Sequence, residues 1–187
     1  MIIGICGNSG CGKSTFADEL VKFSNGRAIR YDIDTLGHDI LLLDSVKKDI
    51  SNEFGEELIV NGYVDRKKLS KIVFNNTKEM DKLTEITWKH MELEIDNFIK
   101  TNKDKIIILD WLLLPKTKFF DMCDIKILLD IPYEVRMNRA MLRDHITEEE
   151  FALREKAAYK YNKKDFTYVV NINNYLEIEK KVKNIIW

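Results

Sequence analysis

The sequence predicts an α/β sandwich with a mostly parallel sheet, and three observations support this fold class. Short apolar runs alternate with helical patterns along the chain. Two of the runs, KIIILD at 105–110 and DIKILLDIP at 124–132, are continuously apolar, which is typical of parallel strands covered by helices on both faces. The first run, MIIGIC, ends in a glycine-rich turn that leads into a helical pattern. We therefore expect a strand, a loop and a helix to open the chain.

Length, charge and cysteine content exclude several classes of protein. The 187 residues fit a single domain, 1–187, and 45% hydrophobic residues are ordinary for a folded chain. A net charge of −1 provides no overall field for nucleic acid. Cys6, Cys11 and Cys123 form no C-x-x-C pair, which favours a reducing cytoplasm over a disulfide framework or a zinc site. The opening MIIGICGNSG is predicted to be a buried strand and neither a signal peptide nor a membrane span.

The middle of the chain is predicted to be a helical insertion. A second strand is expected in RAIRYDID at 27–34, after an SNG turn. From about 36 to 100 the pattern is mostly helical, and the clearest amphipathic segments are 66–74 and 80–100. We expect no linker between domains, because no low-complexity tract interrupts the chain.

The last third of the chain combines a strand with a polar cover. FTYVVNIN at 166–173 is a candidate final strand. The stretch before it is rich in Arg and Lys, and TEEE provides a helix start with Thr147 as the cap and Glu150 at the capping-box position. We expect 139–165 to form an exposed lid.

The first loop matches a phosphate-binding pattern at every fixed position. Gly7, Gly12, Lys13 and Ser14 fit G-x-x-x-x-G-K-[ST] between the expected strand and helix. Glycines let backbone N–H groups converge on a phosphate, and the helix N-terminus adds partial positive charge. Lys13 would reach the β- and γ-phosphates, and the Ser14 hydroxyl is placed to bind Mg²⁺. The predicted nucleotide-binding residues are Gly7, Asn8, Ser9, Gly10, Cys11, Gly12, Lys13, Ser14 and Thr15.

Cys11 in this loop has two interpretations. A helix N-terminus lowers the pKa of a thiol, so Cys11 could act as a redox sensor. The favoured interpretation is a small residue tolerated at a variable position of the loop.

A phosphate-binding loop serves GTP switches as well as kinases. DTLG at 34–37 and NKKD at 162–165 resemble the D-x-x-G and N-K-x-D elements of small GTPases. However, DTLG follows Lys13 too closely to leave room for a switch segment, and NKKD lies in the polar cover instead of ending an apolar strand. The switch is therefore the less favoured alternative, and a kinase is the favoured one.

A kinase needs a base for the attacking hydroxyl and cations for the transferred phosphoryl group. Asp32 and Asp34 alternate with Ile33 near the end of the second expected strand, so both carboxylates are predicted to face the phosphate site. Asp34 is the candidate base. Arginines at spacings of three and four share one helix face and could neutralise phosphoryl charge, or merely solvate the helix; they are Arg136, Arg139 and Arg143.

With these motifs in place, the chain resembles the dephospho-CoA kinase family of P-loop kinases. The resemblance lies in GNSGCGKST, YDIDTLGHDI, EFGEELIVNGYVDRKKLSKIVF, RAMLRD and YVVNINNYLEIEKKV, in that order along the chain. It implies a three-layer P-loop kinase fold with a helical acceptor-side insertion and a lid. It also implies ATP-dependent phosphorylation of the ribose 3′-hydroxyl of a small-molecule acceptor, dephospho-CoA, with Mg²⁺.

The resemblance implies roles for individual residues. Asp34 would be the catalytic base, Lys13 would bind the ATP phosphates, and Arg139 and Arg143 would stabilise phosphate from the lid. Asn173 is a candidate near the adenine. Asp32 and Asp110 would be candidates for outer groups around Mg²⁺.

Three departures from the family pattern fall on the acceptor side and the lid. TWK around Trp88 replaces Leu-His-Pro, and WLLLP from Trp111 replaces Pro-Leu-Leu with its following Glu. The lid glutamine is not evident in LREKAAYKYN. A divergent kinase of a nucleoside monophosphate or another nucleotide-like acceptor is therefore the second hypothesis. The two tryptophans could line an altered acceptor pocket, although buried core aromatics are the favoured interpretation.

Overall fold

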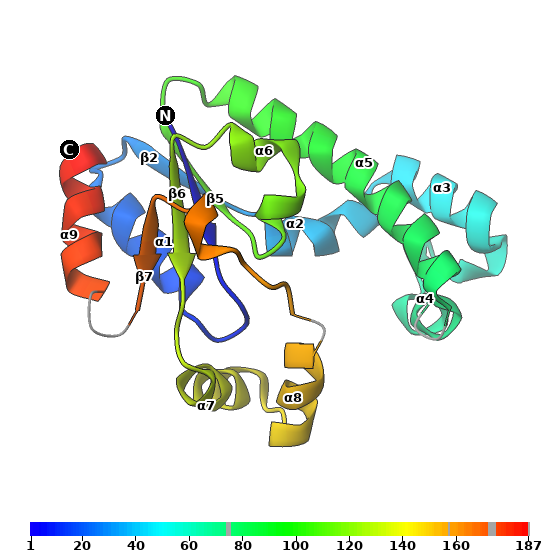
Figure 1. The fold of residues 1–187 in the computed structure, drawn as a ribbon. Helices are drawn as coiled ribbons and strands as arrows, with labels where there is room; N and C mark the ends of the chain where they lie inside the picture. Colours follow the sequence, from blue (N-terminus) through cyan, green and yellow to red (C-terminus); the bar gives the residue numbers. More distant parts are fainter. Residues whose placement is uncertain (74–75, 157, 172–174, 187) are drawn as a thin grey trace. The chain divides into compact units, whose positions relative to one another are not determined.

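The computed structural model describes residues 1–73, 76–156, 158–171 and 175–186. The chain divides into two compact units, one made of Met1–Ile33 with Asn102–Trp187 and the other of Asp34–Thr101. The second unit has nearly the bounds expected for the helical insertion, 36–100. Figure 1 shows the elements of both units along the chain.

The larger unit contains a five-stranded sheet in the order β2-β5-β1-β6-β7. Each pair of neighbouring strands is parallel, which confirms the predicted α/β class. Because the chain leaves central β1 for β2 on one side and reaches β6 on the other, a crevice is expected at the carboxyl end of β1. The strand bounds are β1 Ile2–Cys6, β2 Ala28–Asp32, β5 Ile106–Asp110, β6 Ile125–Leu129 and β7 Tyr168–Val170.

Alternate residues of β1 show how the sheet is covered on two faces. Ile3 and Ile5 share a buried cluster with side chains of α1 (Lys13–Phe23) and α9 (Tyr175–Ile186). Gly4 faces the other way, and a Cβ atom there would lie 2.8 Å from both Leu114 and Cys123. Leu114 begins η3 (Leu114–Lys116), and Cys123 follows α6 (Lys118–Asp121), so both belong to the connection between β5 and β6. Helical layers therefore cover both faces, as expected for a three-layer fold.

Two helices follow the carboxyl end of β6 and form the region expected to be the lid. They are α7 (Tyr133–Asp144) and α8 (Glu148–Lys156), followed by η4 (Lys163–Asp165). The predicted capping box is confirmed, because Glu150 N–H donates to Thr147 Oγ1 at 3.3 Å and Thr147 N–H donates to the Glu150 carboxylate at 2.8 Å. Phe151 of α8 packs against Met137 and Ala140 of α7.

The smaller unit is mostly helical, as the sequence predicts, with one addition. A short hairpin pairs β3 (Ile59–Val60) with β4 (Tyr63–Val64) across a turn in which Asn61 has φ 52° and Gly62 φ 82°. An Asn-Gly turn with two positive φ angles is a strong hairpin signal that the helical prediction overlooked. The helices are α2 (Ile33–Asp39), η1 (Ile40–Leu42), α3 (Asp44–Phe54), η2 (Glu56–Leu58), α4 (Arg66–Val73) and α5 (Thr77–Thr101).

The second strand ends earlier than expected. β2 stops at Asp32, and helix α2 begins at Ile33. The prediction that Asp32 and Asp34 alternate along one strand was therefore wrong, because Asp34 lies in the first turn of a helix. Asp34 still directly follows the carboxyl end of β2, and its side chain is exposed.

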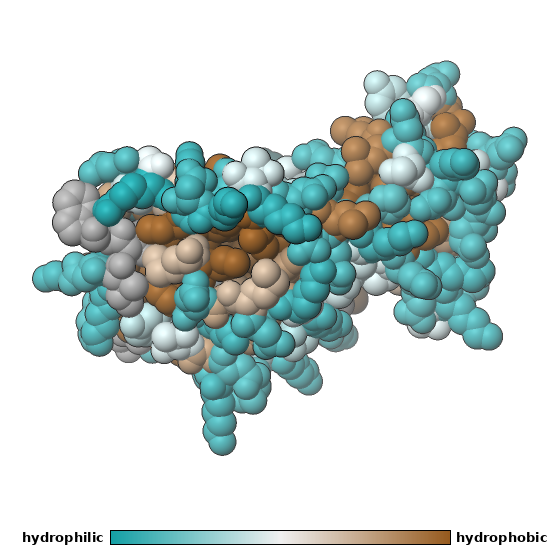
Figure 2. Space-filling model, turned by 90° about the horizontal axis from the view of Figure 1, so that it is seen from above, coloured by the Kyte–Doolittle hydropathy of each residue, from teal (hydrophilic) through white to brown (hydrophobic). Residues whose placement is uncertain are grey.

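Charged and polar side chains make up most of the surface in Figure 2. Within the part of the chain that the structure describes, no helix is long and apolar enough to cross a bilayer.

Candidate active site

The loop between β1 and α1 has the backbone of a phosphate-binding loop. Gly10 and Gly12 adopt positive φ angles of 78° and 91°, which residues other than glycine rarely adopt. A Cβ atom on Gly10 would lie 2.1 Å from the backbone oxygen of Arg136, so this glycine is also required for close packing on α7. Gly12 caps α1, and the free N–H groups of the first helical turn follow it.

The side chains of this loop and of the helical turn after it differ in their exposure to solvent. Lys13 folds back so that its ammonium group donates to the Gly7 carbonyl at 3.0 Å. Ser14 and Thr15 are exposed in the first turn of α1. Cys11, in contrast, is buried in the core cluster, and burial raises the pKa of its thiol. A suppressed thiolate favours the interpretation of Cys11 as a tolerated small residue over the redox sensor.

A buried carboxylate lies beside Ser14. Asp110 ends β5, in register with Ile5 of β1 and Asp32 of β2. Ser14 Oγ donates to Asp110 Oδ2 at 3.2 Å, and Arg30 donates to the same oxygen. Burial raises the pKa of Asp110, while the Lys13 ammonium and the Arg30 guanidinium oppose that rise.

The donor set suits a magnesium ion that brings its own water and phosphate ligands. Mg²⁺ prefers oxygen ligands and usually keeps several waters. The Ser14 hydroxyl is one such oxygen, and the Oδ1 atom of Asp110 is buried without any hydrogen-bond partner in the described structure. Among the described residues, no group of three or more His, Cys, Asp or Glu side chains is arranged to hold a metal by itself. The chain therefore fits a cation bound together with nucleotide.

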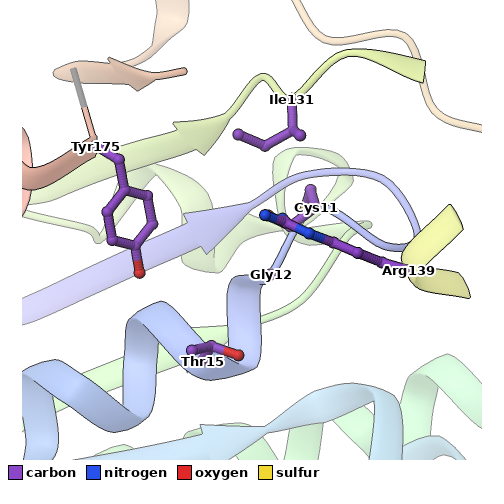
Figure 3. Close-up of a pocket in the computed structure, with 6 residues that line it drawn as sticks. All are labelled: Cys11, Gly12, Thr15, Ile131, Arg139 and Tyr175. Atoms are coloured by element: carbon purple, nitrogen blue, oxygen red, sulfur yellow. The ribbon is translucent and has the colours of Figure 1, made fainter. Parts of the chain in front are cut away.

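Arg139 reaches from α7 toward the loop. Its Nη1 atom lies 3.5 Å from the Cys11 carbonyl oxygen, at the limit of a hydrogen bond. Figure 3 shows its guanidinium beside Cys11, with Tyr175 across the pocket. The pocket has a volume of about 440 Å³ and is lined by Cys11, Gly12, Thr15, Ile131, Arg139 and Tyr175. The Arg139 guanidinium lines this pocket above the first turn of α1, so it is well placed to contact phosphate.

The other two arginines of α7 do not join Arg139 there. Arg136 is buried and forms a bidentate ion pair with Glu155 of α8 at 2.7 and 2.9 Å. Its Nε atom also donates to the Ile131 carbonyl at 2.9 Å. The expectation that Arg136 neutralises phosphoryl charge was therefore wrong, because its donors are used within the protein. Arg143 forms an ion pair with Asp144, and its role toward phosphate stays a prediction.

Tyr161 is a site residue that the sequence analysis did not identify. Its hydroxyl accepts a hydrogen bond from the Gly7 N–H at 3.2 Å and donates to the Leu112 carbonyl at 2.8 Å. It thereby joins the segment after α8 to the phosphate loop. No local pattern distinguishes this tyrosine from its neighbour Tyr159. Arg30, by contrast, could have been identified, because it alternates with Asp32 in the expected strand and so faces the same side.

The structure describes three of the four remaining candidate site residues, which are Trp88, Trp111 and Asp34. Trp111 is buried directly after β5, as favoured for a core aromatic, and Trp88 is half-buried on α5. Asn173 lies outside the described residues. Asp34 stays a prediction as the base.

Comparisons with known proteins identify the family. A family model described as "Dephospho-CoA kinase" matches residues 1–179. The chain belongs to the dephospho-CoA kinase family. The dephospho-CoA kinase of Fusobacterium nucleatum is 35% identical over 98% of this chain and 95% of its own length. That of Aquifex aeolicus is 33% identical over 98% of this chain and 93% of its own length.

Solved structures agree with the fold. TT1252 from Thermus thermophilus covers 100% of this chain and 95% of its own, with a TM-score of 0.79 and 25% identity. Dephospho-CoA kinase from Campylobacter jejuni gives a TM-score of 0.60 at 24% identity, over 99% and 96% of the two chains. A shikimate kinase from Acinetobacter baumannii gives 0.57 at 15% identity, over 99% and 92%. The predicted family and P-loop kinase fold are thus confirmed, and the chain is an ATP-dependent phosphotransferase.

Proposed function

We propose that this chain transfers the γ-phosphoryl group of ATP to the ribose 3′-hydroxyl of dephospho-CoA, using Lys13, Asp34 and Arg139. The observation that carries the proposal is membership of the dephospho-CoA kinase family across 1–179, combined with an intact phosphate loop at the carboxyl end of central β1. The three free cysteines, all buried, support a reducing cytoplasm as the location of this reaction.

The phosphate loop and Arg139 would hold the donor. Backbone N–H groups of the loop and the Lys13 ammonium provide positive charge at the β- and γ-phosphates. Arg139 lines the pocket above the first turn of α1 and would stabilise charge that develops during transfer. Ser14 and Asp110 would hold Mg²⁺, whose contribution when bound is to neutralise charge on the phosphates.

Asp34 would act on the acceptor. Two observations support this role: Asp34 follows the last residue of β2 by two positions, and the sequence resembles the family at this point of the chain. In the proposed step the 3′-oxygen attacks the γ-phosphorus, the bond from that phosphorus to ADP breaks, and Asp34 accepts the hydroxyl proton. Closure of the lid helices over the site would exclude water and limit hydrolysis of ATP.

A screen of acceptors tests the function. ADP release is measured in a coupled assay with ATP and Mg²⁺, comparing dephospho-CoA with adenosine and the common nucleoside monophosphates. We expect saturable turnover with dephospho-CoA. Saturable turnover only with a monophosphate would overturn the assignment in favour of a divergent nucleotide kinase, and tight GTP binding without transfer would favour a switch.

Two substitutions test the residue roles with the accepted substrate. Asp34→Asn should lower turnover by roughly 10²–10⁴-fold with ATP binding largely intact, because a positioned base contributes about that much. Lys13→Ala should abolish turnover while the chain remains folded. Asp39→Asn, exposed on the same helix as Asp34, is the matched control and should change little. Near-normal turnover of Asp34→Asn would remove Asp34 from the role of base.

A further inference from the structure

The two oxygens of the Asp110 carboxylate are used very unequally. Oδ2 accepts from Arg30 Nε at 3.0 Å, from Arg30 Nη2 at 2.7 Å and from Ser14 Oγ at 3.2 Å. Oδ1 is buried and has no partner among the described residues. An unpaired buried acceptor is destabilising, and Oδ1 keeps its full capacity to accept a hydrogen bond from a bound group.

We propose that Arg30 is a positioning residue of the phosphoryl-transfer site, which orients Asp110 and, through it, the Ser14 hydroxyl for a cation bound with nucleotide. This inference rests on the proposed function, since it concerns the same cation. Arg30 touches neither nucleotide nor cation in this scheme. It acts only through Asp110.

The direction of one hydrogen bond explains how Arg30 could influence the cation. A serine hydroxyl has one proton and two lone pairs. When Ser14 donates its proton to Asp110 Oδ2, its lone pairs remain free to bind a cation. Arg30 fixes that oxygen as the acceptor, because it binds the same atom through two N–H groups. The free Oδ1 is then available to accept from a water of the cation.

Arg30 is itself held by acidic groups from three elements. Its Nη1 atom donates to Asp18 of α1 at 3.0 Å, and Nη2 donates to Asp32 of β2 at 2.7 Å as well as to Asp110 of β5. The planar guanidinium can make these contacts at once, whereas a lysine ammonium cannot reproduce the fork. It also separates the negative charges of Asp32 and Asp110, which lie opposite each other in the register of β2 and β5.

A purely structural role for Arg30 predicts something different. If Arg30 only joined α1, β2 and β5, its loss would lower stability and weaken nucleotide binding with and without metal alike. A positioning role predicts a selective effect on the cation. Residues that orient metal ligands typically change metal affinity by about 10–100-fold when they are replaced.

The test measures ADP binding to the full chain by calorimetry, across a range of Mg²⁺ concentrations and in EDTA. For Arg30→Gln we expect the Mg²⁺ concentration that half-saturates the enhancement of ADP binding to rise about tenfold or more. ADP binding in EDTA should stay within about threefold of the unaltered chain. Arg30→Lys should give an intermediate shift, and it carries the test if Arg30→Gln does not fold. A Mg²⁺ requirement within threefold of normal in the folded variant would overturn the proposal.

Two further variants complete the experiment. Arg27→Gln, just before the amino end of the same strand, is the matched control and should leave the Mg²⁺ requirement unchanged. The double variant Arg30→Gln/Asp110→Asn should be no worse than Asp110→Asn alone, because Arg30 acts through Asp110. Additive shifts in that double variant would overturn the proposal. These binding measurements contain no acceptor substrate. They therefore test the role of Arg30 even if dephospho-CoA is not the acceptor.

Discussion

Two arginine-carboxylate clusters contact the phosphate-loop region, and they are built on different scaffolds. In the strand cluster, Arg30 of β2 binds Asp110 of the neighbouring strand β5. In the helix cluster, Arg136 of α7 binds Glu155 of α8 and also donates to the Ser9 carbonyl of the loop at 3.3 Å. The first cluster orients a residue beside Ser14, and the second joins the expected lid to the loop.

The difference lies in what holds each pair together. The backbone hydrogen bonds of a parallel ladder set the register of β2 and β5, so Arg30 and Asp110 are neighbours before any side chain contributes. No ladder joins α7 to α8, and their packing depends on side-chain contacts such as those of Phe151 and on the ion pair itself. The helix cluster should therefore be the easier of the two to displace, as a lid requires.

The largest effect is expected where the loop meets the helix cluster. Gly10→Ala would place a Cβ atom 2.1 Å from the backbone oxygen of Arg136, at a residue with φ 78°. Backbone cannot move aside as a flexible side chain can, so we expect a loss of about 2–4 kcal/mol in the free energy of unfolding, together with loss of kinase activity. Urea denaturation followed by circular dichroism measures the change.

A second glycine provides the matched control for this prediction. Gly26 has a similar φ of 83°, but a Cβ atom there would meet nothing within 4 Å. Gly26→Ala should therefore cost only the backbone strain, about 1 kcal/mol. Equal losses in the two variants would contradict the explanation by packing against α7.

A smaller effect is expected from the helix cluster alone. Glu155→Gln keeps the shape of the side chain but leaves the buried Arg136 guanidinium without its counter-charge. We expect the free energy of unfolding to fall by about 1–3 kcal/mol, less than for a fully buried pair because 27% of the Glu155 side chain is exposed. In urea denaturation the midpoint of unfolding should move to a lower urea concentration. Glu177→Gln, which breaks an exposed ion pair with Lys181 on the outer side of α9, should leave the midpoint unchanged. A shift no larger than that control would show that the helix cluster does not depend on its charge.

The smallest effect concerns the exposed end of the lid helices. Arg143, by its hydrogen bond, and then Arg154 lower the pKa of Asp144 to about 2. A lowered pKa in the folded chain means that the stabilisation is complete above about pH 4 and is lost as the pH falls toward about 2. Because both arginines are largely exposed, solvent screening should keep this contribution below about 1 kcal/mol.

Carboxyl titration by NMR tests the assignment of that shift. In the unaltered chain the Asp144 carboxyl should titrate near pH 2, and Arg143→Ala should raise its pKa toward the ordinary value. Lys156→Ala, which removes a different exposed cation from α8, is the control and should leave the titration unchanged. An unchanged Asp144 titration in Arg143→Ala would assign the shift to another group.

Features that depend on neighbouring residues in the chain could be predicted, whereas features that depend on packing could not. The backbone of the loop between β1 and α1 was predictable, because its glycines lie in one short segment and permit the positive φ angles found there. The capping box at Thr147 was predictable for the same reason. Asp34 shows the limit of such local reasoning. A strand was expected to continue through it, yet α2 begins at Ile33, so its side chain is presented by a helical turn.

The sequence by itself determined the fold class, the family, the phosphate loop and the alternation of Arg30 with Asp32, because each follows from residues close together in the chain. Only the tertiary structure decided which distant side chains meet. Gly7 and Tyr161 are 154 residues apart and share a hydrogen bond, and three arginines on one helix have three different partners. The physical reason is that spacing along a helix or strand defines which way a side chain faces, whereas its partner depends on how the elements pack.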